Sequence, residues 1–283
     1  MRLSSLLKSL PEEVRVISEQ ETDDPEIARV VHDSRTVEPG DLFCCVRGAR
    51  HDGHDYVEKA KLAGAVAVLV DQPVACQLPT VLVASVRKTM PYIAGEIAGN
   101  PSRHLKVVGV TGTNGKTSVT SMLADVLQSL GWDSRTIGTL SGERTTPEAP
   151  EFQRSLADWV IDGVDCVAAE VSSHALDQYR VDATRFAAVA FTNLGRDHLD
   201  YHTTMESYAQ AKGRLFNPLF TDRAVVVTDG EAGKRQAALA AAAGLEVVEV
   251  STSGVESVVG REFVEVPWRG YQLKVSVGGR FAV

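Results

Sequence analysis

The amino-acid sequence predicts an α/β protein in which a small N-terminal α/β domain precedes a doubly wound, mostly parallel sheet. Two observations carry this prediction. Short apolar runs recur between helical segments without polar alternation, as expected of parallel strands that are buried on both faces. A glycine-rich turn, VTGTNGKTS at 110–118, separates one such run from a helical segment. In sheets of this kind the ligand binds beyond the carboxyl ends of the strands.

The composition indicates a globular protein with two domains. A chain of 283 residues can form two cores of ordinary size, and its 44% hydrophobic and 23% charged residues are typical of soluble proteins. The formal net charge of −8 argues against nucleic acid or a membrane surface as a partner. An anionic substrate would therefore need local positive charge, from helix N-termini, arginines or a bound metal.

The sequence also predicts where the protein works. No apolar run approaches the length of a membrane span, so we expect no membrane insertion. The first residues, MRLSSLLKSLPEE, do not form a signal peptide, because their apolar stretch is short and acidic residues follow it. The four cysteines contain no C-x-x-C pair, which favours free thiols and a cytoplasmic location.

The first domain is expected to span 1–102 and the second 103–283, because the turn-forming residues Asn-Pro and Ser in the segment AGNPSRHL follow a predicted helix. In the first domain, the apolar runs DLFCCV and GAVAVLV alternate with helical stretches such as YVEKAKLAG. In the second, the predicted strands are KVVGVTG, DCVAAEVS, RFAAVAFTN and RAVVVTDG. The tail YQLKVSVGGRFAV predicts strands and a turn.

A helix is predicted over 119–130, where apolar residues recur at helical spacing and Gly131 follows as a C-cap. The predicted apolar stripe of this helix consists of Val119, Met122, Leu123, Val126, Leu127 and Leu130.

The turn before this helix resembles a phosphate-binding loop with one displaced glycine. The usual spacing G-x-x-x-x-G-K-[ST] would place the first glycine at position 110, which is Val110. A strand–turn–helix order nevertheless directs backbone N–H groups and the helix dipole at one point. Lys116 would add positive charge there, and the Thr117 hydroxyl could bind Mg²⁺. The alternative is a tight glycine turn with a solvated lysine, but the context favours a P-loop-type phosphate site.

Polar residues follow two further predicted strands. Glu170 ends one strand, and Asn193, Asp197 and His198 follow another. If both strands neighbour the loop strand, a carboxylate and an imidazole converge on the same edge. Such oxygen and nitrogen ligands suit a second divalent cation.

Each of these side chains also has a purely structural interpretation. Glu170 could pair with Arg180 or Arg185, and His198 could cap a turn with Asp197 as its hydrogen-bond partner. Periodicity alone identifies Lys212 as a surface lysine whose stem lies along an apolar helix face. Only the joint placement at strand ends beside the loop favours a functional site.

Together these motifs resemble the Mur ligase family, and within it the UDP-N-acetylmuramoyl-tripeptide synthetases. The strings that carry the resemblance run from about Ser34 to the last residue: HDSRTVEPGDLFCCVRGARHDGHDY, VTGTNGKTS, TTPEAP, AEVSSHALDQYRV, FTNLGRDHLDYH and YAQAKGRLF. The family's loop reads T-G-T-x-G-K-T, so its first glycine corresponds to Gly112.

The resemblance implies an ATP- and Mg²⁺-dependent ligase of peptidoglycan synthesis. Such an enzyme adds the third amino acid to UDP-N-acetylmuramoyl-L-alanyl-D-glutamate through an acyl phosphate, which the incoming amine then attacks. The implied partners are the UDP-muramoyl dipeptide and an amino acid, and we expect a monomer. The identity of the amino acid does not follow from these residues.

The resemblance also implies roles for individual residues. Lys116 matches the phosphate lysine and Thr117 the first Mg²⁺ ligand. Glu170 and His198 match ligands of a second Mg²⁺, and Lys212 matches a lysine that the family carbamylates. The nucleotide loop comprises Gly112, Thr113, Asn114, Gly115, Lys116, Thr117 and Ser118, with Asn114 near the γ-phosphate. The substrate-binding positions are Ser34, Ala49, Arg50, His51, Thr145, Thr146, Ser172, Gln178 and Arg180, with His32 nearby.

The sequence departs from the family pattern in three places. The segment 141–144 is short, Gly195 replaces a common serine, and the Asp-Asn-Pro motif of the C-terminal domain is absent. We therefore expect a truncated chain without the amino-acid-binding domain, which binds UDP-muramoyl substrate but completes no ligation. Two alternatives remain open at this point. One is another Mur or folylpolyglutamate-type ligase, and the other is a non-catalytic nucleotide-binding module.

Overall fold

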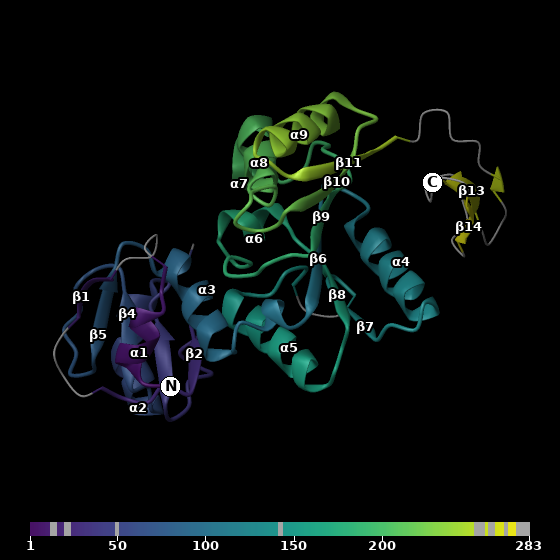
Figure 1. The fold of residues 1–283 in the computed structure, drawn as a ribbon. Coiled ribbons are helices and arrows are strands. Elements are labelled where there is room, and N and C mark those ends of the chain that lie inside the picture. The colour runs from purple at the N-terminus through teal and green to yellow at the C-terminus, as the bar shows by residue number, and fades with distance from the viewer. Residues whose placement is uncertain are drawn as a thin grey trace.

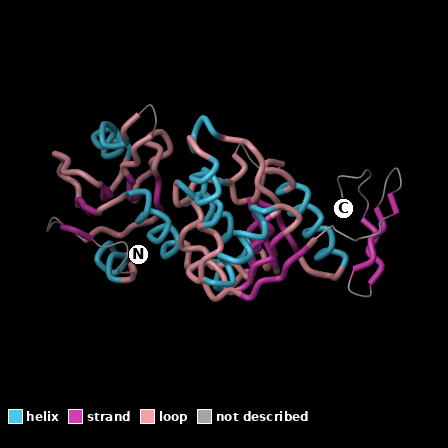
Figure 2. The backbone as a smooth tube through the Cα atoms, turned by 90° about the horizontal axis from the view of Figure 1, so that it is seen from above, coloured by secondary structure: helices cyan, strands magenta, loops and turns pink. Residues whose placement is uncertain are grey.

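The chain folds around two mainly parallel sheets, which confirms the predicted α/β class (Figure 1). The computed structural model describes residues 1–11, 16–19, 24–48, 51–140, 144–251, 258–259, 264–268 and 271–275. Seen from above, the N-terminal region, the central sheet with its helices and the C-terminal strands follow one another along the length of the molecule (Figure 2).

The first sheet has the strand order β1-β5-β4-β3-β2. Strands β2 to β5 pair in parallel, and β1 pairs antiparallel to β5. Its strands are β1 (Val16–Glu19), β2 (Arg29–Val31), β3 (Asp41–Cys44), β4 (Ala67–Val70) and β5 (Thr80–Val83). The helices of this region are α1 (Leu3–Lys8), η2 (Gly53–Tyr56), α2 (Val57–Ala63), α3 (Val86–Ile97) and η3 (Pro101–Arg103). Two apolar clusters cover the two faces of the sheet.

The second sheet is parallel throughout, with the order β11-β10-β9-β6-β8-β7. Its strands are β6 (Lys106–Thr111), β7 (Ser134–Ile137), β8 (Cys166–Glu170), β9 (Ala188–Phe191), β10 (Arg223–Val227) and β11 (Glu246–Val250). All four strands predicted here are present. From β6 the chain forms β7 at the edge and β8 next to β6 on one side, and then β9, β10 and β11 on the other, so β6 lies at the topological switch point.

Helices cover both sides of this sheet, with α4 on one side and α5 and α6 on the other (Figure 1). The helices are α4 (Lys116–Ser129), α5 (Ala149–Ile161), α6 (Ser173–Asp177), α7 (Leu199–His202), α8 (Met205–Gly213) and α9 (Glu231–Ala242). None of the helices in the described ranges is long and apolar enough to cross a membrane.

A third, antiparallel sheet follows, formed by β12 (Val258–Val259), β13 (Val264–Trp268) and β14 (Tyr271–Val275). A strand was predicted at the start of the tail YQLKVSVGGRFAV, and β14 confirms it. The remainder of that prediction, 276–283, lies outside the described residues.

The predicted helix after the loop is confirmed as α4, but its predicted apolar stripe is partly wrong. The buried residues of α4 are Thr120 and Ala124, whereas Val126 and Leu130 are 53% and 69% exposed. Because α4 packs on β7 and β8, small side chains occupy its contact with the sheet. Gly131 has a φ of +85° directly after the C-cap, as the sequence predicts.

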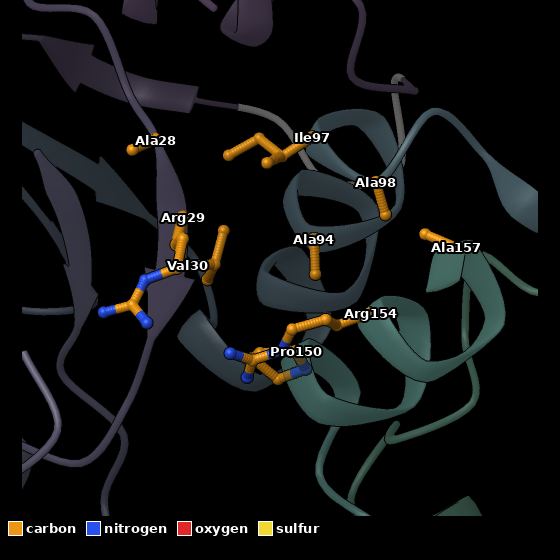
Figure 3. Close-up of a pocket in the computed structure, with 9 residues that line it drawn as sticks. All are labelled: Ala28, Arg29, Val30, Ala94, Ile97, Ala98, Pro150, Arg154 and Ala157. Carbon is orange, nitrogen blue, oxygen red and sulfur yellow. The ribbon is translucent and has the colours of Figure 1, made fainter. Parts of the chain in front are cut away.

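Helices α3 and α5 pack together at the seam between the two sheets, and Ala149 at the start of α5 belongs to an N-terminal apolar cluster. The seam is not completely filled. A cavity of about 150 Å³ lies between β2, α3 and α5, lined by small or apolar residues and by Arg29 and Arg154 (Figure 3). None of the predicted site residues lines it. The domain boundary at 102/103 stays a prediction.

Phe152→Ala should destabilise the central domain. The Phe152 side chain is fully buried in the larger apolar cluster, so its removal leaves a cavity that costs about 3–5 kcal/mol. Leu239→Ala, on α9 at 55% exposure, is the control and should change stability by about 0.5 kcal/mol or less. Urea unfolding measures both variants, and equal destabilisation would contradict the assigned core.

Candidate functional site

The glycine-rich loop leaves the carboxyl end of β6 and enters α4, and two of its glycines are required by the backbone. Gly112 has a φ of +151°, and a Cβ atom there would overlap the Thr192 hydroxyl. Gly115 has a φ of +85° and is the N-cap of α4. Val110, where the common spacing has glycine, is instead a buried residue of β6. The displaced glycine thus belongs to a loop that begins two residues later.

The end of β9 holds this loop in place. The backbone N–H of Thr113 donates to the Asn193 carbonyl at 2.9 Å, and the Asn114 N–H donates to Asn193 Oδ1 at 3.0 Å. The Thr192 hydroxyl donates to the Asn114 carbonyl at 2.6 Å. The predicted neighbour relation between the loop strand and the Asn193 strand is therefore present, and it fixes the conformation of the loop.

Lys116, the first residue of α4, folds back over the loop. Its Nζ donates to the carbonyls of Gly112 and Thr113, each at 2.9 Å. Burial lowers the pKa of this ammonium group, and the nearby Glu170 carboxylate opposes the shift. Lys116 thus brings positive charge to the N-terminus of α4, where the helix dipole already favours an anion.

Lys212 reaches the same point from α8. Its Nζ donates to the Gly112 carbonyl at 2.7 Å and lies 4.4 Å from the centroid of the Tyr208 ring. The residue is only 1% exposed, so the interpretation as a surface lysine is wrong. Burial lowers the pKa of Lys212 to about 7, and repulsion from Lys116 adds to the effect. A substantial fraction of Lys212 is therefore a neutral amine near neutral pH.

Glu170, at the end of β8, lies beside the loop and is 1% exposed. Its Oε2 accepts a hydrogen bond from the Thr117 hydroxyl at 3.0 Å, and its Oε1 accepts one from the Thr139 N–H at 2.9 Å. The alternative pairing of Glu170 with Arg180 or Arg185 is wrong. Arg180 instead pairs with Glu148, and Arg185 with Asp222.

The Thr117 and Glu170 oxygens fit a magnesium ion. Octahedral Mg²⁺ binds oxygen at 2.0–2.1 Å, so two neighbouring ligands lie roughly 2.9 Å apart. The Thr117 hydroxyl and Glu170 Oε2 are 3.0 Å apart. Within the described ranges, His, Cys, Asp and Glu side chains form no group of three that could hold a metal. Any ion here would therefore take further oxygens from water or phosphate, as Mg²⁺ commonly does.

His198 lies on the β9 side of the loop, at the N-cap of α7 with a φ of +51°. Its backbone N–H donates to Asp197 Oδ1 at 2.9 Å, and its Nε2 is 3.5 Å from Asp197 Oδ2. The local features of the capping interpretation are thus present. Its ring also stacks edge-on with His174 and Tyr208, at 4.7 and 6.1 Å between centroids.

Tyr208 connects this histidine to the loop, because its hydroxyl lies 3.1 Å from Thr113 Oγ1. Sequence reasoning assigned no role to Tyr208 or Thr139, although both carry usable signals. Tyr208 precedes Lys212 by one helical turn, and Thr139 follows β7 as Glu170 ends β8.

The predicted substrate residues fall into two groups. In the first domain, His32, Ser34 and His51 line a cavity of about 460 Å³. Ala49 and Arg50 were also predicted there, but they lie outside the described residues.

The second group lies at the carboxyl edge of the central sheet. The Thr146 hydroxyl donates to the Glu170 carbonyl at 2.8 Å and accepts from the Ser172 N–H at 3.1 Å. Thr145 Oγ1 is 3.1 Å from Thr139 Oγ1. Arg180 donates to the carbonyl of Thr146 at 2.9 Å and to Gln178 Oε1 at 2.8 Å.

Comparison with known proteins identifies the family. The Mur ligase middle domain matches residues 110–283, and the Mur ligase family catalytic domain matches residues 26–105. The chain belongs to the Mur ligase family. The predicted resemblance is thereby confirmed.

Three proteins similar to this chain carry the same enzyme name. The UDP-N-acetylmuramoyl-L-alanyl-D-glutamate–2,6-diaminopimelate ligase of Aquifex aeolicus is 43% identical over 211 residues, covering 71% of this chain and 44% of that protein. The ligase of the same name from Chromobacterium violaceum is 38% identical over 282 residues, covering 90% and 57%. A solved structure with that enzyme name superposes with a TM-score of 0.79 at 25% identity, covering 90% of this chain and 57% of the other. The chain thus spans about half the length of these relatives.

Lys212→Met should change how stability depends on pH. The folded pKa of about 7 lies below the ordinary value of 10.5, so the unfolded state binds more protons between these two values. Lys212 therefore lowers stability progressively as the pH falls from 10.5 to 7, by about 1.4 kcal/mol per pKa unit. As the pH falls from 10.5 to 7, the stability of the variant relative to wild type should therefore rise, and it should level off below pH 7.

Urea unfolding of both proteins across this pH range measures the difference. Lys8→Met, at an exposed position of α1, is the control and should run parallel to wild type. A parallel curve for Lys212→Met would show that the buried lysine titrates like an exposed one.

Proposed function

We propose that this chain binds UDP-N-acetylmuramoyl-L-alanyl-D-glutamate and ATP for a ligase that adds the third amino acid of the peptidoglycan peptide. One observation carries the proposal: Lys116, Lys212 and the Thr117–Glu170 pair converge on the loop at the switch point of the sheet. The names of the relatives support the muramoyl dipeptide as substrate and 2,6-diaminopimelate as the amino acid.

The chemistry of such a ligase explains the charges at the loop. A carboxylate is a poor acylating agent, so it first attacks the γ-phosphate of ATP to give an acyl phosphate and ADP. The amine then displaces phosphate and forms the peptide bond. Both reactants of the first step are anions. Lys116 and the N–H groups at the start of α4 would hold the phosphate oxygens and stabilise the charge that develops on them.

We assign the metal-binding role to Thr117, Glu170 and His198. When bound, Mg²⁺ would offset the repulsion between phosphate and carboxylate. The 3.0 Å contact between the Thr117 and Glu170 oxygens supports these two residues as ligands of one ion. This grouping differs from the sequence prediction, which gives Thr117 to a first Mg²⁺ and Glu170 with His198 to a second. The imidazole of His198 would come from the opposite side of the loop, where its ring packs near Tyr208.

We further propose that Lys212 is carbamylated. Only a neutral amine attacks CO₂, and burial makes the neutral form of Lys212 accessible near pH 7. In this step the amine nitrogen bonds to the CO₂ carbon and releases a proton, which leaves a carboxylate on Nζ. The product exchanges a cation next to Lys116 for an anion, so the repulsion between two neighbouring ammonium groups is replaced by attraction.

The substrate would span both domains. We assign the uridine end to the side of the cavity at Ser34 and His51, and the muramoyl peptide to Thr145, Thr146, Ser172, Gln178 and Arg180. We also place the activity in the cytoplasm. All four cysteines are free thiols, and Cys44, Cys45 and Cys166 are buried, as suits a reducing compartment.

Calorimetric titration of the chain tests this function. The chain should bind the UDP-muramoyl dipeptide, and it should bind ATP more tightly with Mg²⁺ than with EDTA. UDP-muramoyl tripeptide and dihydrofolate, the ligands of the two rival ligase classes, should bind more weakly than the dipeptide. Lys116→Ala should weaken ATP but not the dipeptide. The proposal would be rejected if the chain preferred dihydrofolate, or if it bound ATP but neither of the two muramoyl ligands.

Gly138→Ala should disturb the metal site without replacing any of its proposed ligands. A methyl group at this position would overlap the Glu170 carboxylate and displace it from Thr117. Metal affinity commonly falls 10–100-fold when the support of a ligand is lost, so the gain in ATP affinity with Mg²⁺ should drop by about that factor. UDP-N-acetylglucosamine should bind as in wild type.

Gly230→Ala is the matched control for this variant. Gly230 has an ordinary φ of −119°, and a methyl group there would meet no atom within 4 Å. An unchanged Mg²⁺ effect in Gly138→Ala would show that the observed position of Glu170 is not needed for metal binding.

A further inference from the structure

Three arginines from both sides of the domain seam surround a single carboxylate, that of Glu148. Arg87 comes from α3 of the first domain, Arg144 precedes α5, and Arg180 follows α6. Glu148 is the N-cap residue of α5 and is only 7% exposed. Apart from Arg180, which belongs to the proposed substrate residues, none of these side chains has a role in the site described above.

The contacts of Glu148 are unevenly divided between its two oxygens. Oε1 accepts a hydrogen bond from Arg144 at 2.8 Å and forms an ion pair with Arg180 at 2.9 Å. Oε2 lies 3.7 Å from Arg87, is buried, and accepts no hydrogen bond from the described residues. Glu148 thus connects two guanidinium groups directly and attracts the third across the seam.

The cluster leaves excess positive charge at a cavity. The whole cluster, with three guanidinium groups and one carboxylate, carries a net charge of +2. Three of its members, Arg87, Arg144 and Glu148, line the same 460 Å³ cavity as Ser34 and His51. Lys59 and Arg35 line it as well, although Arg35 is paired with Asp33. An anion of the ligand would find unneutralised guanidinium groups here, which hold carboxylates in bidentate fashion.

The cluster also lies close to the proposed reaction centre. Arg180 donates to the Thr146 carbonyl, and the Thr146 hydroxyl donates to the Glu170 carbonyl. A dipeptide that ends in glutamate has two carboxylates, of which only one is activated. The other stays anionic throughout the reaction and needs a fixed counter-charge at a short distance from the reacting group.

We propose that Glu148 is a positioning residue that holds Arg87, Arg144 and Arg180 together as a receptor for the unreacted carboxylate of the muramoyl dipeptide. The inference rests on the proposed function and names the part of the substrate that this cluster binds. The physical need for Glu148 is clear, because three adjacent guanidinium groups repel one another. Burial also lowers the pKa of Arg180, and the Glu148 carboxylate opposes that shift.

Glu148→Gln separates positioning from simple electrostatics. The substitution keeps the shape but removes a negative charge, so electrostatics alone would tighten the binding of an anion. Positioning predicts the opposite, because the arginines lose the charge that holds them. We expect the affinity for UDP-N-acetylmuramoyl-L-alanyl-D-glutamate to fall about 10-fold or more. UDP-N-acetylglucosamine, which has no carboxylate, should bind within about two-fold of wild type.

Arg144→Met is the second variant, and it should fold because Arg144 is 57% exposed. It should weaken the dipeptide selectively, and the double variant should lose less than the product of the two single effects, because both remove one interaction. Glu246→Gln removes an exposed carboxylate paired with Arg223 and should change nothing. If Glu148→Gln fails to fold, as judged by circular dichroism, the selectivity of Arg144→Met decides.

The outcomes distinguish this inference from the function on which it rests. Unchanged or tighter binding of the dipeptide by Glu148→Gln overturns the inference alone. Equal losses for both UDP ligands overturn it too, because they indicate a general structural role. If wild type binds neither UDP ligand, the proposed function fails and the inference fails with it.

Discussion

The carbonyl oxygen of Gly112 accepts hydrogen bonds from two lysines, Lys116 and Lys212, and the site is arranged around this crowded point. Two ammonium groups at one oxygen repel each other, and burial increases the repulsion because the local dielectric is low. Burial lowers the pKa of both lysines, and for Lys212 repulsion from Lys116 adds to the effect, so its pKa falls to about 7. The fold therefore supplies one cation for phosphate and one amine that can lose its charge. The positive charge that remains also attracts anions to this edge of the sheet.

Thr146 connects the arginine cluster around Glu148 with the phosphate loop. Thr146 accepts from Ser172, donates to the Glu170 carbonyl, and offers its own carbonyl to Arg180. A displacement of Arg180 would therefore be transmitted through Thr146 to the backbone carbonyl of Glu170. Such networks of buried polar groups specify a single arrangement more than they stabilise it. The Glu148 cluster, which includes Arg87, Arg144 and Arg180, and the phosphate loop thus form one continuous polar network along the carboxyl edge of the sheet.

The sequence predicts the fold well because its strands are short, apolar and buried on both faces. Strands β6, β8, β9 and β10 can therefore be predicted without knowing which strands they pair with. It predicts less about α4, since the pattern of apolar residues cannot reveal that the sheet contact selects Thr120 and Ala124. Lys212 is misread for a similar reason: periodicity places it on an apolar face but does not show that Tyr208 and the loop enclose it. Of the Glu148 cluster, the sequence predicts only Arg180 as a site residue, because Arg87 lies 61 positions from Glu148 and no local motif links them.

The domain seam combines two kinds of contact that differ in their consequences. The α3–α5 contact and Ala149 give apolar burial, which is tolerant of small shifts, and the 150 Å³ cavity shows that the fit there is incomplete. The contacts of Arg87 with Glu148 and Gln178 are directional, and at 3.7 and 3.4 Å both are long. A buried ion pair of this length adds little net stability, because desolvation offsets the attraction. Its effect is on geometry: a ligand anion that draws Arg87, Arg144 and Arg180 inward would shorten the contacts between domains. Under the proposed function, binding of the dipeptide would then be coupled to the contact between α3 and the central sheet through these three guanidinium groups.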